Sequence, residues 1–106
     1  MLTYQKSLDA LGDRTRRRVF ELLRDGPLPV RRIAEQLPVS RPAVSQHLRV
    51  LSEAGLVMFR RDGARRLYEV DRAGLAGLRA WIDGFWDDAL ARFKEAAERE
   101  GSDDDE

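Results

Sequence analysis

The chain has 106 residues, 42% of them hydrophobic, and its 19 Lys and Arg balance its 19 Asp and Glu. This size and composition predict one soluble globular domain with a modest core. No apolar run approaches the roughly 18 residues of a membrane span, and the chain does not open on a signal-peptide pattern, so we expect a cytoplasmic protein with no membrane partner. The absence of cysteine excludes disulfides and thiol chemistry.

The zero formal charge conceals a strong asymmetry along the chain. Residues 1–72 carry 15 Lys and Arg against 9 Asp and Glu, whereas residues 73–106 carry 4 against 10, so their net charges are +6 and −6. A basic part with an acidic far end fits a protein that binds nucleic acid. Since 17 of the 19 basic residues are Arg, a bias that GC-rich coding also produces, the positions of the arginines carry more weight than their number.

Apolar spacing predicts two short helices at the start of the chain. The first ends at Gly12, and Tyr4, Leu8 and Leu11 form its apolar face. Asp13 is the expected N-cap of a second helix near 14–24. The segment DGPLP at 25–29 is then a turn.

A helix-turn-helix pattern follows this turn. A third helix begins at Val30, includes Leu37 on its apolar face and is broken by Pro38. Only Val39 separates Pro38 from the next segment, SRPAVSQHLRVL (40–51), which is the most informative stretch of the chain. Two helices joined by so short a connection are typical of this motif.

Segment 40–51 predicts an amphipathic helix with a nucleic-acid-binding front. Ser40 is the expected N-cap, and Pro42 falls in the first turn, where its missing N–H costs nothing. Val44, Leu48 and Leu51 share the apolar face. The opposite face carries small groups, an amide and an arginine, which fit a major groove, where Gln pairs with adenine and Arg with guanine. The candidate contacts are Ser40, Arg41, Pro42, Ser45, Gln46 and Arg49.

Two alternatives stay open within this helix. Its polar face could be a solvated surface that touches nothing. His47, the single histidine, lies at the edge of the apolar face with Val50 and Ala54. It could pack there or lie near a phosphate, contact DNA directly, or act as a ligand or pH switch.

A basic β-hairpin is predicted next. Leu56 to Arg61 and Arg65 to Val70 read as two strands, and Asp62-Gly63 between them is a hairpin turn signal. Four arginines flank the turn and could enter or flank a minor groove, although basic residues also protect sheet edges. These residues are Arg60, Arg61, Arg65 and Arg66. A helix-turn-helix followed by such a hairpin is a winged helix-turn-helix, mainly α with two strands.

The last helix, expected over 72–99 and capped by Asp71, is unusually apolar for a small domain. Part of its apolar surface must pack on the domain, and a second subunit best accounts for the rest; a ligand pocket between paired last helices is the alternative. The expected interface residues are Tyr4, Leu8, Leu11, Leu78, Trp81, Ile82, Phe85, Trp86, Ala89 and Phe93. Residues 1–100 would form the domain and 101–106 a disordered acidic tail.

With these features in place, the chain resembles the ArsR-type (ArsR/SmtB) bacterial transcriptional repressors over about residues 5–95. The segments that carry the resemblance are ALGDRTRRRVFELL, LPVSRPAVSQHLRVLSEAGLV and RRDGARRLYEVD. The resemblance implies a homodimer through the first and last helices. It also implies that double-stranded DNA is the partner, as an imperfect inverted-repeat operator.

The chain departs from the metal-sensing members of that family. Their third-helix cysteines would fall near Pro29 and Arg31, which cannot ligate as thiolates. Their last-helix zinc site pairs an Asp with a His two residues on, but Asp83 is followed by Phe85 at that position. Carboxylates alone suit Zn²⁺ poorly. We therefore expect no metal and no cofactor, and the sequence leaves the effector unknown.

Two other classes of function fit the sequence less well. A protein-interaction module on the same scaffold, with weak or no specific DNA binding, is the main alternative. The basic face that the 40–51 helix and the hairpin are expected to form argues against it. An enzyme is least expected because the chain offers no Gly-rich phosphate loop and no convergent carboxylate pair.

Overall fold

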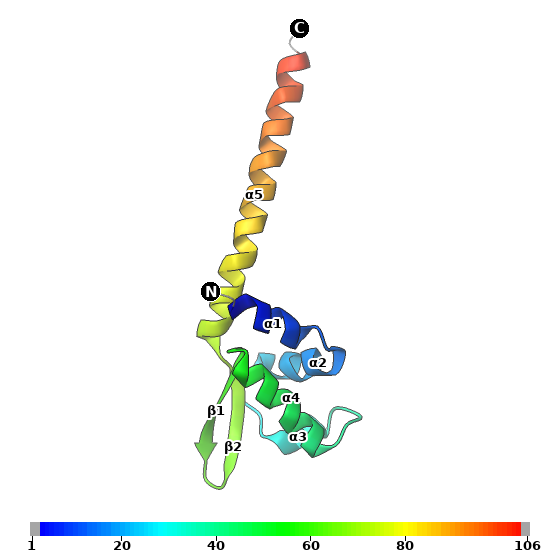
Figure 1. The fold of residues 1–106 in the computed structure, drawn as a ribbon, viewed down its shortest axis with the longest axis vertical. Helices are drawn as coiled ribbons and strands as arrows, with labels where there is room; N and C mark the ends of the chain where they lie inside the picture. Colours follow the sequence, from blue (N-terminus) through cyan, green and yellow to red (C-terminus); the bar gives the residue numbers. More distant parts are fainter. Residues whose placement is uncertain (1–2, 105–106) are drawn as a thin grey trace.

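The computed structural model describes residues 3–104 and has the predicted mainly helical architecture with one antiparallel hairpin. α5 rises away from the other elements, which gather at its N-terminal end (Figure 1). None of the helices in this described range is long and apolar enough to cross a membrane. The elements in chain order are α1 (Thr3–Leu11), α2 (Arg14–Leu22), the 3₁₀ helix η1 (Leu23–Asp25), α3 (Val30–Ala34), α4 (Arg41–Glu53), β1 (Val57–Asp62), β2 (Arg65–Val70) and α5 (Arg72–Asp104).

The three predicted N-caps are confirmed. The Asp13 carboxylate accepts a hydrogen bond from the backbone N–H of Arg16 at 2.9 Å. Ser40 Oγ accepts from the N–H of Ala43 at 3.3 Å. Asp71 accepts from the first-turn N–H groups of α5 at 3.1 and 3.3 Å. Each cap satisfies donors that a helix start otherwise leaves unpaired, which is why these helices begin where the sequence indicated.

Two helices end earlier than their apolar patterns suggested. α2 gives way to η1 at Leu23, because the chain must turn at Gly26, whose φ of 140° suits glycine. α3 ends at Ala34 although Leu37 belongs to the core. Tight i→i−3 hydrogen bonds carry the chain on to Leu37, so this leucine reaches the core from a turn.

α5 extends beyond its expected end at 99. The helix is assigned to Asp104, so it includes 101–104, which the sequence predicted as disordered. Extending an existing helix needs no new nucleus, which is why a polar segment can continue one. Residues 105–106 lie outside the described residues. The division into a domain of 1–100 and a tail of 101–106 stays a prediction.

The core is centred on α4. Val44, Leu48 and Leu51 are completely buried, as their spacing predicted. Burial of each such side chain contributes about 1.5–3 kcal/mol. The surrounding buried residues come from every other element: Ala10, Val19, Leu23, Ile33, Leu37, Ala54, Leu56, Val57, Tyr68 and Leu78. This packing fixes which side of α4 faces outward.

The second strand has its predicted bounds, Arg65–Val70, whereas the first strand is shifted by one residue from its predicted position, Leu56 to Arg61. β1 pairs with β2 from Val57↔Val70 to Asp62↔Arg65, so the turn is Gly63-Ala64 and not Asp62-Gly63. Gly63 has a φ of 65°, and Ala64 has no positive φ. A positive φ at the first turn residue alone is the pattern of a type II′ turn, which places glycine first and so moves the turn by one position.

Leu28 joins the hairpin to the segment before α3. Its N–H donates to the carbonyl oxygen of Tyr68 at 2.9 Å, and the N–H of Tyr68 donates back at 2.9 Å. This antiparallel bridge couples β2 to the start of the helix-turn-helix.

Three elements meet at the end of α4. Gly55 leaves the helix with a φ of 79°, and the N–H of Asp71 donates to the carbonyl oxygen of Leu56 at 2.9 Å. A Cβ at Gly74 would clash with the backbone carbonyl of Gly55, so α5 begins in direct backbone contact with this turn. α1 covers the junction, since the Ser7 hydroxyl donates to the carbonyl oxygen of Ala54 at 3.3 Å.

Gly74→Ala should lower the free energy of unfolding by about 1–3 kcal/mol, because the added methyl meets backbone that cannot rotate away. Gly84→Ala is the matched control, since no atom lies near a Cβ there. It should raise that free energy by about 0.5–1 kcal/mol through helix propensity alone. Urea denaturation followed by circular dichroism measures both, and equal changes would contradict the close contact.

Asp13→Asn should cost stability at neutral pH and progressively less in acid. The N–H of Arg16, and then the charges of Arg16 and His47, hold the pKa of the Asp13 carboxyl below its ordinary 3.8. The carboxylate therefore stabilises the fold above its unfolded pKa, and this contribution is lost as pH falls through the lower folded pKa. Asn retains an acceptor without the charge. Unfolding free energies of both proteins from about pH 7 down to about pH 3 should converge; a constant difference would contradict the charge effect.

Candidate nucleic-acid interface

The polar face of α4 lies open to solvent. All six predicted contacts, Ser40, Arg41, Pro42, Ser45, Gln46 and Arg49, are exposed. Ser40 Oγ is engaged as the N-cap acceptor, so its proton and one further lone pair stay available. Arg49 Nε lies 3.5 Å from Glu53 Oε1 one turn further on. An exposed i,i+4 pair of this kind is worth well under about 1 kcal/mol, so it leaves Arg49 free to exchange partners.

The hairpin divides the four predicted arginines between two faces. The register places Arg61 opposite Arg66 on the face that carries Phe59 and Tyr68, whereas Arg60 and Arg65 lie on the other face. All four are exposed. The sequence indicated one basic cluster, but strand alternation separates it into two pairs.

The arginines also differ in their partners. Arg60 pairs with Glu69 at 3.3 Å, and Arg65 holds Asp62 Oδ2 through both Nε and Nη2, at 3.3 and 3.2 Å. The Arg66 guanidinium lies 4.3 Å from the centroid of the Phe59 ring, a cation–π contact that leaves its N–H groups available. Within residues 3–104 Arg61 has no carboxylate partner.

The arrangement of the elements places these two surfaces together. The hairpin tip lies at the same end of the molecule as α3 and α4, and the C-terminal part of α5 points the opposite way (Figure 1). The basic part of the described chain, residues 3–72, thus forms the body, and the acidic residues of 73–104 follow α5 away from it. A helix with an open polar face beside a basic hairpin can enter the roughly 12 Å major groove of a duplex and contact its backbone.

A groove between α3, α4 and the hairpin adds a residue that sequence reasoning missed. It measures about 520 Å³ and is lined by Pro29, Val30, Arg31, Ser45, Arg65, Arg66 and Tyr68. The sequence marks Arg31 only as a position where a metal-binding cysteine is absent. The available signal was a basic residue at the start of α3, the helix before α4, which we call the reading helix. Only the fold brings this residue beside the hairpin.

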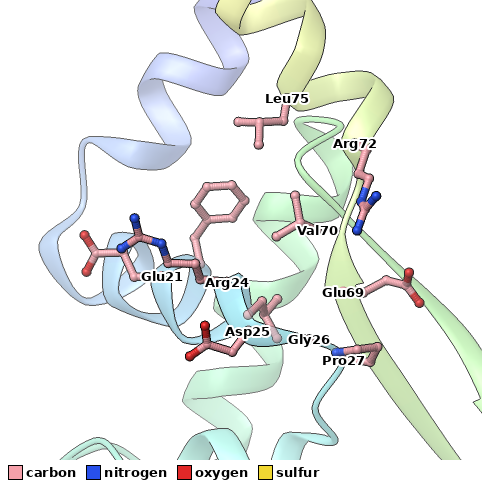
Figure 2. Close-up of a pocket in the computed structure, with 11 residues that line it drawn as sticks. Glu21, Arg24, Asp25, Gly26, Pro27, Glu69, Val70, Arg72 and Leu75 are labelled. Carbon is pink, nitrogen blue, oxygen red and sulfur yellow. The ribbon is translucent and has the colours of Figure 1, made fainter.

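A second cavity, of about 610 Å³, lies between α2, η1, β2 and the start of α5. Figure 2 shows the apolar side chains of Val70 and Leu75 inside it, with the charged groups of Glu21, Arg24 and Arg72 toward its rim. The sequence placed its alternative ligand pocket between paired last helices instead. This cavity is formed by one protomer alone.

The expected dimer residues divide into two groups. Leu78 is buried in the core of its own protomer, and Leu11 packs against that core. Tyr4 stacks on Trp81 with ring centroids 5.8 Å apart, which ties α1 to α5. The others remain exposed, and neighbouring Leu90 joins them: Leu8, Trp81, Ile82, Phe85, Trp86, Ala89, Leu90 and Phe93.

His47 is half-buried. Its Nδ1 is buried and has no hydrogen-bond partner among the described residues. This position fits the packing interpretation of His47 better than a place on the open face of α4.

Comparisons with known proteins agree with this geometry. The family model described as a helix-turn-helix domain matches residues 11–58. The HTH-type transcriptional regulator Rv2034 of Mycobacterium tuberculosis is 49% identical over 97% of this chain and 99% of its own length. The fold, the open helix face and the basic hairpin define a winged helix-turn-helix protein.

Solved structures narrow the class further. A crystal structure titled possible transcriptional regulator for arsenical resistance is 51% identical, with a TM-score of 0.68 over 81% of this chain and 90% of that one. A homodimeric winged helix-turn-helix domain from Mycobacterium bovis, titled a possible ArsR-family regulator, is 28% identical, with a TM-score of 0.66 over 83% and 82%. This chain belongs to the ArsR-type (ArsR/SmtB) family of winged helix-turn-helix transcriptional regulators. That membership favours a regulator over an interaction module.

Proposed function

We propose that this protein is a homodimeric transcriptional repressor that binds an imperfect inverted-repeat operator. The observation that carries the proposal is the open polar face of α4 beside the arginine-rich hairpin. In a twofold dimer, the two α4 helices would enter successive major grooves about 34 Å apart. Repression, and not activation, follows from the family alone.

The proposed dimer uses the exposed apolar stripe of α5. Phe85, Trp86 and Phe93 are 60%, 63% and 74% exposed in the single chain. Exposing this much aromatic surface to water is unfavourable. If α5 packed against the α5 of a second chain across a twofold axis, the same surface would be buried on both chains. The Mycobacterium bovis domain, which is described as homodimeric, supports a homodimer.

Within the interface we assign different roles to helix and hairpin. Ser45 and Gln46 would contact base edges, and Arg41 would contact a base or a phosphate. The hairpin arginines would neutralise phosphates or lie at the minor groove, supplying affinity that is independent of sequence. Arg49, one turn further along α4, is better placed for phosphate.

We further propose that the input is not a metal ion. Pro29 and Arg31 replace the thiolates of the third-helix metal sites, and Phe85 replaces the imidazole of the last-helix site. Among the described residues no cluster of three or more His, Cys, Asp or Glu is arranged to hold a metal. We also expect no catalytic activity and a cytoplasmic location, since the proposed partner is genomic DNA.

The test of the proposed function is fluorescence anisotropy with the DNA upstream of the protein's own gene, across a salt series, with a random duplex of equal length as control. Tight binding that prefers the upstream fragment and weakens steeply with salt is the expected result. Weak binding that is equal for both duplexes would favour an interaction module.

Gln46→Ala should relax sequence discrimination and cost about 1–3 kcal/mol per subunit on the cognate fragment, because the substitution removes a bidentate hydrogen-bonding group from the base edge. Arg65→Ala should weaken cognate and random duplexes by the same factor. The ratio of the two dissociation constants, measured for each variant, checks this division of roles. If both variants leave that ratio unchanged, or both change it alike, the division is wrong.

Trp86→Glu should convert the dimer to a monomer at micromolar concentration. Each buried aromatic contributes about 1.5–3 kcal/mol, and the symmetric interface would lose two of them and gain two buried charges. Ala91→Glu is the matched control, because it places the same charge about half a helical turn away from the stripe of Ile82 and Phe93. Light scattering after size-exclusion chromatography gives the mass; a Trp86→Glu protein that remains dimeric would move the interface elsewhere.

A further inference from the structure

The groove between α3, α4 and the hairpin gathers positive charge from elements far apart in the sequence. Arg31 comes from α3, Ser45 from the open face of α4, and Arg65 and Arg66 from β2. Tyr68, Pro29 and Val30 complete its walls. Three arginines line this open hollow of about 520 Å³, so its charge suits an anionic phosphate of a larger ligand and not an apolar ligand.

The arginines of this groove retain unused hydrogen-bonding capacity. Arg31 is exposed and forms no ion pair with any residue of the described chain. Arg66 is stacked on Phe59, an arrangement that fixes the plane of its guanidinium but occupies none of its N–H donors. Arg65 gives two of its donors to Asp62, so three remain.

The backbone holds these groups in a fixed relation. Paired hydrogen bonds of 2.9 Å between Leu28 and Tyr68 fasten the segment before α3 to β2. Ile33 on α3 and Val44 on α4 are both fully buried in the common core. Because these contacts preorganise the walls, the groove needs little rearrangement to receive an anion.

We propose that this groove is a phosphate clamp in which Arg31 and Arg66 hold one DNA backbone phosphate between the reading helix and the hairpin, while Arg65, which projects from the other face of β2, adds positive charge. The inference rests on the proposed function and adds Arg31 as a DNA-contacting residue that the helix and hairpin alone do not indicate. A clamp at this place fixes the angle at which α4 enters the major groove of the duplex, because it anchors the DNA strand that passes from α4 to the hairpin. Because a phosphate contact does not distinguish between bases, it contributes to affinity and fixes the position of the protein along the duplex, but it carries no sequence information.

The experiment compares Arg31→Gln with Arg32→Gln. Both residues are exposed neighbours on α3 and each substitution removes one charge, but Arg32 does not line the groove. Anisotropy is measured for each purified protein with the upstream fragment and with a random duplex over a salt series. Thermal unfolding by circular dichroism confirms that each variant is folded, and Arg31→Lys tests whether charge alone suffices.

Arg31→Gln should weaken binding to both duplexes by the same factor. Each neutralised phosphate changes the slope of log K against log salt by about 0.9, so the expected loss is about eightfold at 0.1 M salt for each phosphate that is no longer neutralised. The slope should fall by that amount per subunit bound. Arg32→Gln should change affinity and slope far less, and Arg31→Lys should recover most of the slope.

Three results would overturn the clamp. Unchanged binding by Arg31→Gln, with wild-type binding intact, refutes the clamp alone. Equal losses of affinity in the Arg31→Gln and Arg32→Gln proteins would mean that DNA binding depends on the overall positive charge of the basic body and not on the position of Arg31. Wild-type protein that binds neither duplex would refute the proposed function itself, and the clamp with it.

Discussion

The backbone contact between Gly55 and Gly74 is the constraint on which the arrangement of this protein depends. Gly55 lies in the turn that follows α4, the hairpin starts two residues later at Val57, and α5 starts against the same turn. The hydrogen bond from Asp71 to Leu56 closes the base of the hairpin at this point. The directions of the reading helix, the hairpin and the long last helix are therefore set by one small junction, where a Cβ on Gly74 would meet the backbone of Gly55 and force the elements apart.

This junction gives α5 a direct mechanical connection to the DNA-binding elements. Tyr4 stacked on Trp81 and Ser7 bonded to Ala54 add a second connection, through α1. A change in how two α5 helices pack would reach the end of α4 through rigid contacts. The junction itself is a backbone contact between two glycines, so it leaves little space for relative movement.

Charge and apolar surface are divided along the length of the molecule. The basic body lies at one end with α4 and the hairpin, and the acidic and aromatic residues of α5 extend from the other (Figure 1). The acidic residues of α5 thus lie away from the surface that would meet phosphate, where they would otherwise repel it. A balanced formal charge is compatible with DNA binding because the two signs are separated in space.

The sequence by itself determined the order and type of the elements, the three N-caps and the buried stripe of α4, because hydrophobic period and capping chemistry are local. It placed β2 correctly but β1 and the turn one residue off, since turn geometry depends on which residue adopts a positive φ. Only the tertiary structure decided that Leu78 belongs to the core of its own chain and that Arg31 lies beside the hairpin arginines. Those outcomes depend on contacts between segments far apart in the chain, such as Leu28 with Tyr68 and Gly55 with Gly74, which local patterns do not encode.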